Sequence, residues 1–187
     1  MINKNTKDKV VNQLAKDVSS HLKESGSSVL VPNAKSFNAK NVLLVKGFQD
    51  SDQIHKLISM YQSIAQKGNQ LKAKDISIMP GTVYPKGKCE MWLIEMVAKT
   101  IESNVYIFSE TCNKTAKKPS VKKLNILVSS LTKSDLIKAK NAAKKGYAIG
   151  EGVNSAKYLG DLPANHCTPR IIEKKVCLLY TSDAADD

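Results

Sequence analysis

Short apolar runs alternate with amphipathic stretches along the first 130 residues, and this alternation limits the fold more than any other feature of the chain. The runs 41–47 and 124–129 are apolar almost throughout, which is typical of strands buried on both faces. Further strands are expected at 28–32, 75–79 and 104–109. The pattern predicts an α/β fold, in which a mostly parallel sheet is covered by helices on both faces.

The helices between these strands are expected at 8–23, 50–66 and 90–101, because apolar residues recur there at steps of three and four. Gly26 and Gly68 follow the first two stretches and are expected to end them.

A long helix is expected at 133–159, with Thr132 and Asp135 forming a capping box at its start. At 1.5 Å per residue it would span ~40 Å, which indicates that it joins two bodies. The middle of its inward face consists of alanine and glycine, so another backbone can approach closely. Gly160 is expected to end it. The expected inward face is Leu136, Ala139, Ala143, Gly146, Ile149, Val153, Ala156 and Leu159.

The formal net charge of +12 is carried almost entirely by lysine, because Arg170 is the only arginine. Arginine supplies the fork geometry that reads guanine and clamps phosphate, whereas lysine acts as a point charge. The densest lysine segment, 114–123, contains no aromatic residue. The charge therefore fits either a solvated surface or a face that binds polyanions weakly.

The sequence gives no catalytic, metal-binding or cofactor-binding residue. It contains no phosphate-binding loop motif and no C-x-x-C pair, and its four cysteines are at least ten positions apart. His166 and Cys167 are adjacent, so their side chains would diverge in an extended loop. No apolar run approaches the ~20 residues that cross a bilayer. The first residues do not form a secretory signal, which predicts a cytoplasmic protein without membrane contact.

Residues 131–169 resemble the leucyl aminopeptidase (cytosol aminopeptidase) family. In that family a long helix with the signature "A…G…AR/KDLxNxPPNxxTP" links the N-terminal domain to the catalytic domain. Asp161 replaces the usual Asn, and Ala164 replaces a frequent second Pro. Weaker similarity extends over roughly 8–175. The matching residues are Gly146, Gly152, Ala156, Lys157, Leu159, Pro163, Asn165, Thr168 and Pro169.

The resemblance implies a three-layer α/β/α macro-like domain followed by a linker helix. The parent enzyme would be a metallo-exopeptidase that releases N-terminal amino acids from peptides. It would use two divalent ions, Mn or Zn, and assemble as a homo-hexamer. The family's metal ligands and its NTDAEGR motif follow the linker, and none is present here.

The last residues, 177–187, contain no lysine and resemble a translated sequencing adapter. We therefore expect a macro-like domain at 1–130, whose first strand is missing, and a linker helix at 131–160. The start of an absent catalytic domain would occupy 161–176, followed by the artefact at 177–187.

The leading hypothesis is a non-catalytic N-terminal fragment of a cytosolic leucyl aminopeptidase, whose partner is its missing catalytic domain. One alternative is a lysine-rich module that binds DNA weakly and loses affinity steeply with salt. Another is a macro-like domain that binds ADP-ribose, which rests on fold analogy alone.

Overall fold

The computed structural model describes residues 27–32, 39–46, 54–80, 85–110, 119–128 and 132–183, with side chains to Leu178. The helix expected at 8–23 lies outside these ranges. The chain divides into two compact units, and each is described by itself. One contains 1–60 and 81–90, and the other contains 61–80 and 91–187.

In the first unit, β1 (Ser28–Pro32) pairs with β2 (Asn41–Val45). The pair is antiparallel, with Ser28 opposite Val45 and Pro32 opposite Asn41. Both strands occur where the apolar runs predicted them. Their direction differs from the parallel arrangement expected for most of the sheet. The connection of eight residues, 33–40, explains this, because a parallel pair needs a crossover of a dozen residues or more.

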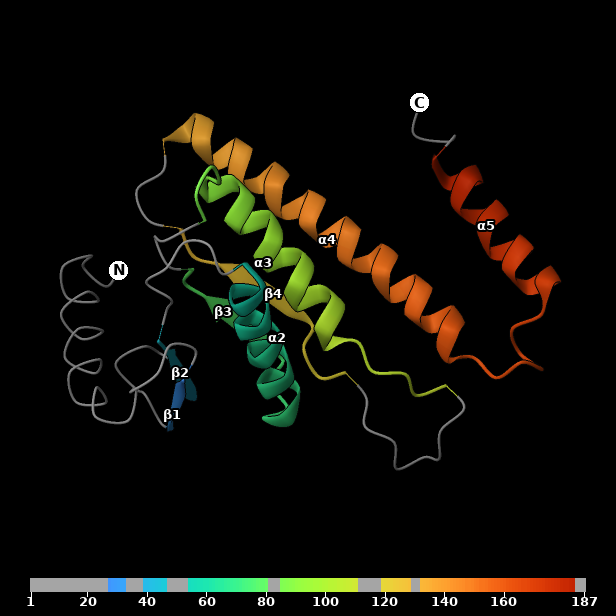
Figure 1. The fold of residues 1–187 in the computed structure, drawn as a ribbon, viewed down its shortest axis with the longest axis horizontal. Helices are drawn as coiled ribbons and strands as arrows, with labels where there is room; N and C mark the ends of the chain where they lie inside the picture. Colours follow the sequence, from blue (N-terminus) through green and yellow to red (C-terminus); the bar gives the residue numbers. More distant parts are fainter. Residues whose placement is uncertain are drawn as a thin grey trace. The chain divides into compact units, whose positions relative to one another are not determined.

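In the second unit, β3 (Asp75–Ile78) and β4 (Lys123–Ile126) form a parallel pair. Asp75 lies opposite Lys123 and Ile78 opposite Ile126. The chain passes from β3 to β4 through helix α3 (Glu90–Val105), which supplies the long crossover that a parallel pair requires. This β–α–β arrangement agrees with the α/β class expected from the sequence (Figure 1).

Helix α3 forms the centre of the core. The row Leu93, Val97, Ile101 and Val105 has exposed fractions of 7% or less. A helix that is apolar around most of its surface is a buried helix. The prediction of a strand at 104–109 was wrong. The helix continues to Val105 because that side chain completes the row, and residues 106–110 have no regular structure.

Helix α2 (Ile54–Gln70) shows a second departure from prediction. Gly68 was expected to end the helix, but it lies inside and is buried. A Cβ atom at Gly68 would overlap the side chain of Ile76 on β3. Glycine is therefore used here for close approach of helix and strand, and the helix ends two residues later.

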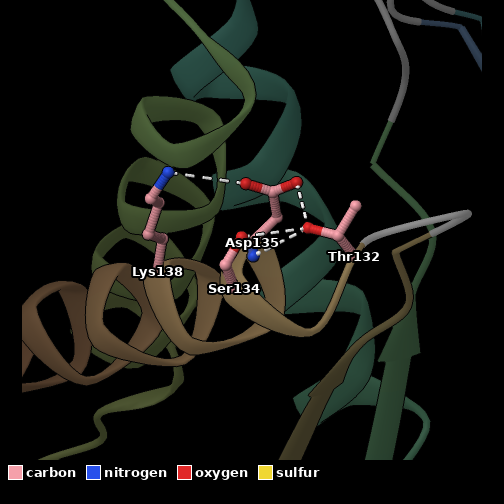
Figure 2. Close-up of polar contacts among 4 residues, drawn as sticks. All are labelled: Thr132, Ser134, Asp135 and Lys138. Carbon is pink, nitrogen blue, oxygen red and sulfur yellow. Dashed lines mark hydrogen bonds and ion pairs between the residues drawn. The ribbon is translucent and has the colours of Figure 1, made fainter.

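Helix α4 (Lys133–Asp161) is the long helix expected from the sequence, and it contains Gly160 rather than ending there. Figure 2 shows its first turn. The hydroxyl of Thr132 accepts a hydrogen bond from the Asp135 amide at 3.2 Å and donates one to Asp135 Oδ2 at 2.6 Å. The predicted capping contact is therefore present. The Thr132 hydroxyl is also the main cause that lowers the pKa of Asp135.

Helix α5 (Pro169–Asp183) follows a short turn. It continues from Val176 through Cys177 to Asp183 without a break, so residues 177–183 of the segment assigned to a sequencing artefact share one helix with the residues before them. Among the described residues, no helix is long and apolar enough to cross a membrane.

Candidate functional site: the packing face and groove of helix α4

Helix α4 packs directly on helix α3 through glycine, and the two helices lie side by side (Figure 1). A Cβ atom on Gly146 would overlap the backbone oxygen of Glu95 and lie 2.9 Å from the Cβ of Ala98. One on Gly150 would lie 2.6 Å from the Cβ of Glu102. Real Cβ atoms essentially never approach this closely. The expectation that small residues admit another backbone is confirmed at these two positions.

The packing face of α4 differs in part from the predicted one. Ala139 and Gly146 are buried as expected, but Gly150 takes the third buried position. Four residues of the expected inward face are exposed: Leu136, Ile149, Val153 and Ala156. The sequence predicts an inward face from the positions of large apolar residues. The close contact with α3 instead buries the residues of α4 that have the smallest side chains. Ile149 and Val153 are each 38% exposed and form an apolar surface on α4.

Polar contacts hold the C-terminal half of α4 on the end of α3. Lys157 Nζ donates to the carbonyl oxygen of Ser103. Asn154 Nδ2 donates to the carbonyl oxygen of Glu102 at 3.0 Å and also lies 3.4 Å from Glu102 Oε1. These contacts satisfy carbonyl groups in the last turn of α3, which have no partner within their own helix.

The segment after α3 is tied to the last turns of α4. The Tyr106 hydroxyl donates to Asp161 Oδ2 at 3.2 Å. Burial and then this hydrogen bond raise the pKa of Tyr106 to about 12. The rings of Phe108 and Tyr158 are 6.1 Å apart and tilted by 54°. Asp161, the departure from the family signature, therefore makes a specific contact in this chain.

The signature residues fall into three groups. Gly146 and Lys157 contact α3, and Leu159 is half-buried. Gly152 has no atom within 4 Å of a Cβ built on it, so helix packing does not explain this glycine. Ala156 is exposed on α4 like Gly152, and the third group, Pro163, Asn165, Thr168 and Pro169, lies in the turn after α4 and at the start of α5. The Pro163 carbonyl accepts from the amides of His166 and Cys167, at 2.8 and 2.9 Å. The Thr168 carbonyl accepts from the first turn of α5, and Pro169 starts that helix.

An open groove of about 580 Å³ lies where α3, α4 and α5 meet. Lys175 Nζ of α5 lies 3.8 Å from the centre of the Tyr158 ring, which is within cation–π range. The acidic residues of the groove are Glu102 and Glu151. Burial, and then the nearby charge of Glu151, raise the pKa of Glu102. The other groove residues are Asn154, Ser155, Leu159, Val176 and Leu178.

The described residues do not fit the metal pair that the family resemblance implies. Nowhere in the described ranges do three or more His, Cys, Asp or Glu side chains gather closely enough to hold a metal ion. His166 and Cys167 lie in the turn before α5, where their backbone amides are bound by the Pro163 carbonyl.

Four lysines gather where β3 and β4 begin. The amides of Lys122 and Lys123 donate to the carbonyl of Lys74 at 2.7 and 3.2 Å, and Lys72 is two residues before Lys74. All four side chains are exposed, with Asp75 opposite Lys123 in the strand register. The sequence placed Lys122 and Lys123 in a lysine-rich segment. It gave no indication of Lys72 and Lys74, because the pairing of distant strands brings them there.

Curated proteins similar to this chain include several named "Probable cytosol aminopeptidase". The relative from Nitrosomonas eutropha is 27% identical over 153 residues, which is 81% of this chain and 30% of the relative. The relative from Nitrosococcus oceani is 30% identical over 149 residues, covering 78% of this chain and 29% of the relative. The chain thus spans about 30% of the length of the curated relatives that it matches. No model of a protein family matches it.

Solved structures show the same relationship in fold. A mutant of tomato leucine aminopeptidase superposes with a TM-score of 0.70 at 19% identity, covering 94% of this chain and 34% of that one. The bottromycin maturation enzyme BotP superposes with a TM-score of 0.66 at 17% identity, covering 86% of this chain and 32% of BotP.

The fold defines an α/β unit that carries a long helix seated on its central helix. In sequence and in fold, the chain is related to the N-terminal part of the leucyl aminopeptidase, or cytosol aminopeptidase, family.

Proposed function

We propose that this chain is the non-catalytic N-terminal part of a cytosolic leucyl aminopeptidase. The parent protein would release N-terminal amino acids from peptides with two divalent metal ions, Mn or Zn, and assemble as a homo-hexamer. The observation that carries the proposal is the extent of the match, which covers about 80% of this chain and about 30% of each relative. The metal ligands would then belong to the remaining part of the protein.

The proposed division of the chain follows from the same resemblance. Residues 1–130 form the macro-like domain, 131–160 the linker helix and 161–176 the start of the catalytic domain. Residues 177–187 are adapter sequence on grounds of composition, although α5 extends as far as Asp183. The exposed Ile149 and Val153 support the role of α4 as a linker, because an apolar helix face favours a packing partner.

Titration with Mn²⁺ tests where the metal ligands lie. One solved neighbour is the bottromycin maturation enzyme BotP in complex with Mn, so manganese is the appropriate probe. We expect calorimetry to give no saturable heat when Mn²⁺ is added to the 187-residue chain. The full-length Nitrosococcus oceani relative, treated identically, is the positive control. Stoichiometric binding of two Mn²⁺ ions by the 187-residue chain would refute the proposal, because its own residues would then form the metal site.

The lysines at the start of β3 and β4 favour a second candidate function, which is weak binding of nucleic acid. Lys72, Lys74, Lys122 and Lys123 present four exposed ammonium groups on two adjacent segments. Contacts of this kind reach phosphate without reading bases, so affinity should fall steeply with salt.

A charge-matched pair of double variants tests this candidate on duplex DNA. Replacing Lys74 and Lys122 by alanine should weaken binding and flatten the dependence on salt by about two contacts. Replacing Lys138 and Lys145, which form ion pairs with Asp135 and Glu95, is the control with the same change in net charge. Equal losses in both variants would show that the overall charge, rather than this lysine group, binds DNA.

A further inference from the structure

Glu102 occupies an unusual position at the contact between α3 and α4. Gly150 has no side chain, so the Cβ and Cγ of Glu102 lie 2.6 and 2.8 Å from the place where a Cβ of residue 150 would stand. The side chain is therefore enclosed between the two helices and is only partly exposed. A carboxylate in such a place loses part of its hydration, which disfavours the charged form.

The groups around Glu102 add to this effect. On α4, Glu151 lines the same groove and accepts a hydrogen bond from the Tyr147 hydroxyl at 3.0 Å. Lys157, also on α4, binds the carbonyl of Ser103, next to Glu102. Lys175 of α5 belongs to the groove and stacks on Tyr158. Burial and Glu151 outweigh these lysines, because the pKa of Glu102 is raised from 4.5.

Asn154 provides the second observation. Its Nδ2 atom donates to the backbone oxygen of Glu102 and approaches Glu102 Oε1, so the orientation of the amide is fixed by two oxygens of one residue. Its Oδ1 atom is buried and has no hydrogen-bond partner among the described residues. A buried acceptor without a donor costs about 1–3 kcal/mol. A protonated Glu102 would carry a hydroxyl group, which can donate to this oxygen after rotation of the carboxyl group.

We propose that the contact between α3 and α4 is linked to a proton on Glu102. Uptake of the proton removes a partly buried charge near Glu151 and supplies the donor that Asn154 Oδ1 lacks, so the two helices bind each other more tightly. Loss of the proton weakens the packing of the C-terminal half of α4 on α3. The direction follows from linkage, because a group that binds its proton more tightly in the folded state destabilises that state as pH rises.

The variant Glu102→Gln tests the proposal in the 187-residue chain. Glutamine keeps the shape of a protonated glutamate and offers an amide donor to Asn154 Oδ1. The Tm of the variant should match that of the wild type at about pH 3, well below the ordinary value of 4.5, where Glu102 is protonated in the folded and the unfolded state, and exceed it at about pH 8. Glu173→Gln removes the same charge from an exposed position of α5 and controls for net charge. A Tm difference that is absent, or that is the same at every pH, overturns the proposal.

A direct titration of the wild-type chain remains decisive if the variant does not fold. The carboxyl carbon of Glu102, followed by ¹³C NMR in glutamate-labelled protein, should titrate with a midpoint above 4.5, the ordinary value. The signal is assigned through the sequential backbone resonances of residues 101–103, because Ile–Glu pairs also occur at 94–95 and 172–173. A midpoint at or below 4.5 overturns the proposal.

Discussion

Replacement of Gly146 by alanine should separate α4 from α3. The new Cβ would overlap the backbone oxygen of Glu95, lie 3.0 Å from its carbonyl carbon and 2.9 Å from the Cβ of Ala98. Two of these three atoms belong to the backbone of α3, so rotation of a side chain cannot relieve the overlap. Overpacking of this kind costs about 1–3 kcal/mol or more, and alanine regains only about 1 kcal/mol through helix propensity. We expect a net loss of about 2 kcal/mol, because the helices must move apart.

Denaturant unfolding of Gly146→Ala and Gly152→Ala, followed by circular dichroism, measures this effect with a matched control. Gly152 lies in the same helix with open space around it, so alanine there should stabilise the chain by about 0.8 kcal/mol. In a chain of this size, 1 kcal/mol corresponds to about 2–4 °C in Tm. The two variants should thus change stability in opposite directions. A Gly146→Ala chain at least as stable as the wild type would refute the helix contact described above.

Two further variants test the cap of α4 and the polar joint beside β4. Thr132→Ala should cost about 1 kcal/mol at neutral pH. The loss of stability relative to the wild type should be smaller in acid. The Thr132 hydroxyl holds the pKa of Asp135 below 3.8, and the stability that this contributes is lost as pH falls through the folded-state pKa. Thermal unfolding at about pH 7 and pH 3 measures the difference in Tm, and a difference that is the same at both pH values would contradict the prediction. Asn69→Ala removes the amide that donates to the Val105 carbonyl at 2.8 Å and accepts from the Ser120 amide at 3.2 Å. We expect urea unfolding to show a loss of about 2 kcal/mol in the free energy of unfolding. The control is Asn141→Ala at an exposed position, which should be nearly neutral.

The positions of the strands could be predicted from the sequence because each is a short apolar run beside a turn residue. The antiparallel direction of β1 and β2 also follows from the sequence, because their connection of eight residues, 33–40, is too short for a crossover, and the general α/β pattern does not take this length into account. The run after Asn104 has the β-branched and aromatic composition of a strand. Its first apolar residue, Val105, instead completes the buried row of α3, and a tertiary contact of this kind overrides local propensity.

The different uses of glycine explain most of the remaining differences between the predicted and the observed helices. A glycine after an amphipathic stretch most often ends the helix, which predicts helix ends at Gly68 and Gly160. Gly68 instead admits Ile76, and Gly150 admits Glu102. Only the three-dimensional neighbours decide between these uses, and the sequence does not contain them. The close approach at Gly146 was predicted correctly because alanine and glycine occur together in the middle of α4, whereas Gly150 was not part of the predicted face.

The polar joints of the candidate site were not predictable for a related reason. Asn154 and Glu102 are 52 residues apart, and Asn69 and Ser120 are 51 residues apart. Each contact depends on the packing of elements that are distant in the chain. By contrast, the cap formed by Thr132 and Asp135 is local, so the spacing of these residues was sufficient to predict it.

Turnover of leucine anilide by the purified 187-residue chain tests the central claim most directly. The assay is run with Mn²⁺ and with Zn²⁺, beside the full-length relative from Nitrosococcus oceani as positive control. The account predicts no turnover above the uncatalysed rate for the 187-residue chain, because a non-catalytic N-terminal part carries no active site. Metal-dependent turnover by this chain alone would contradict the account.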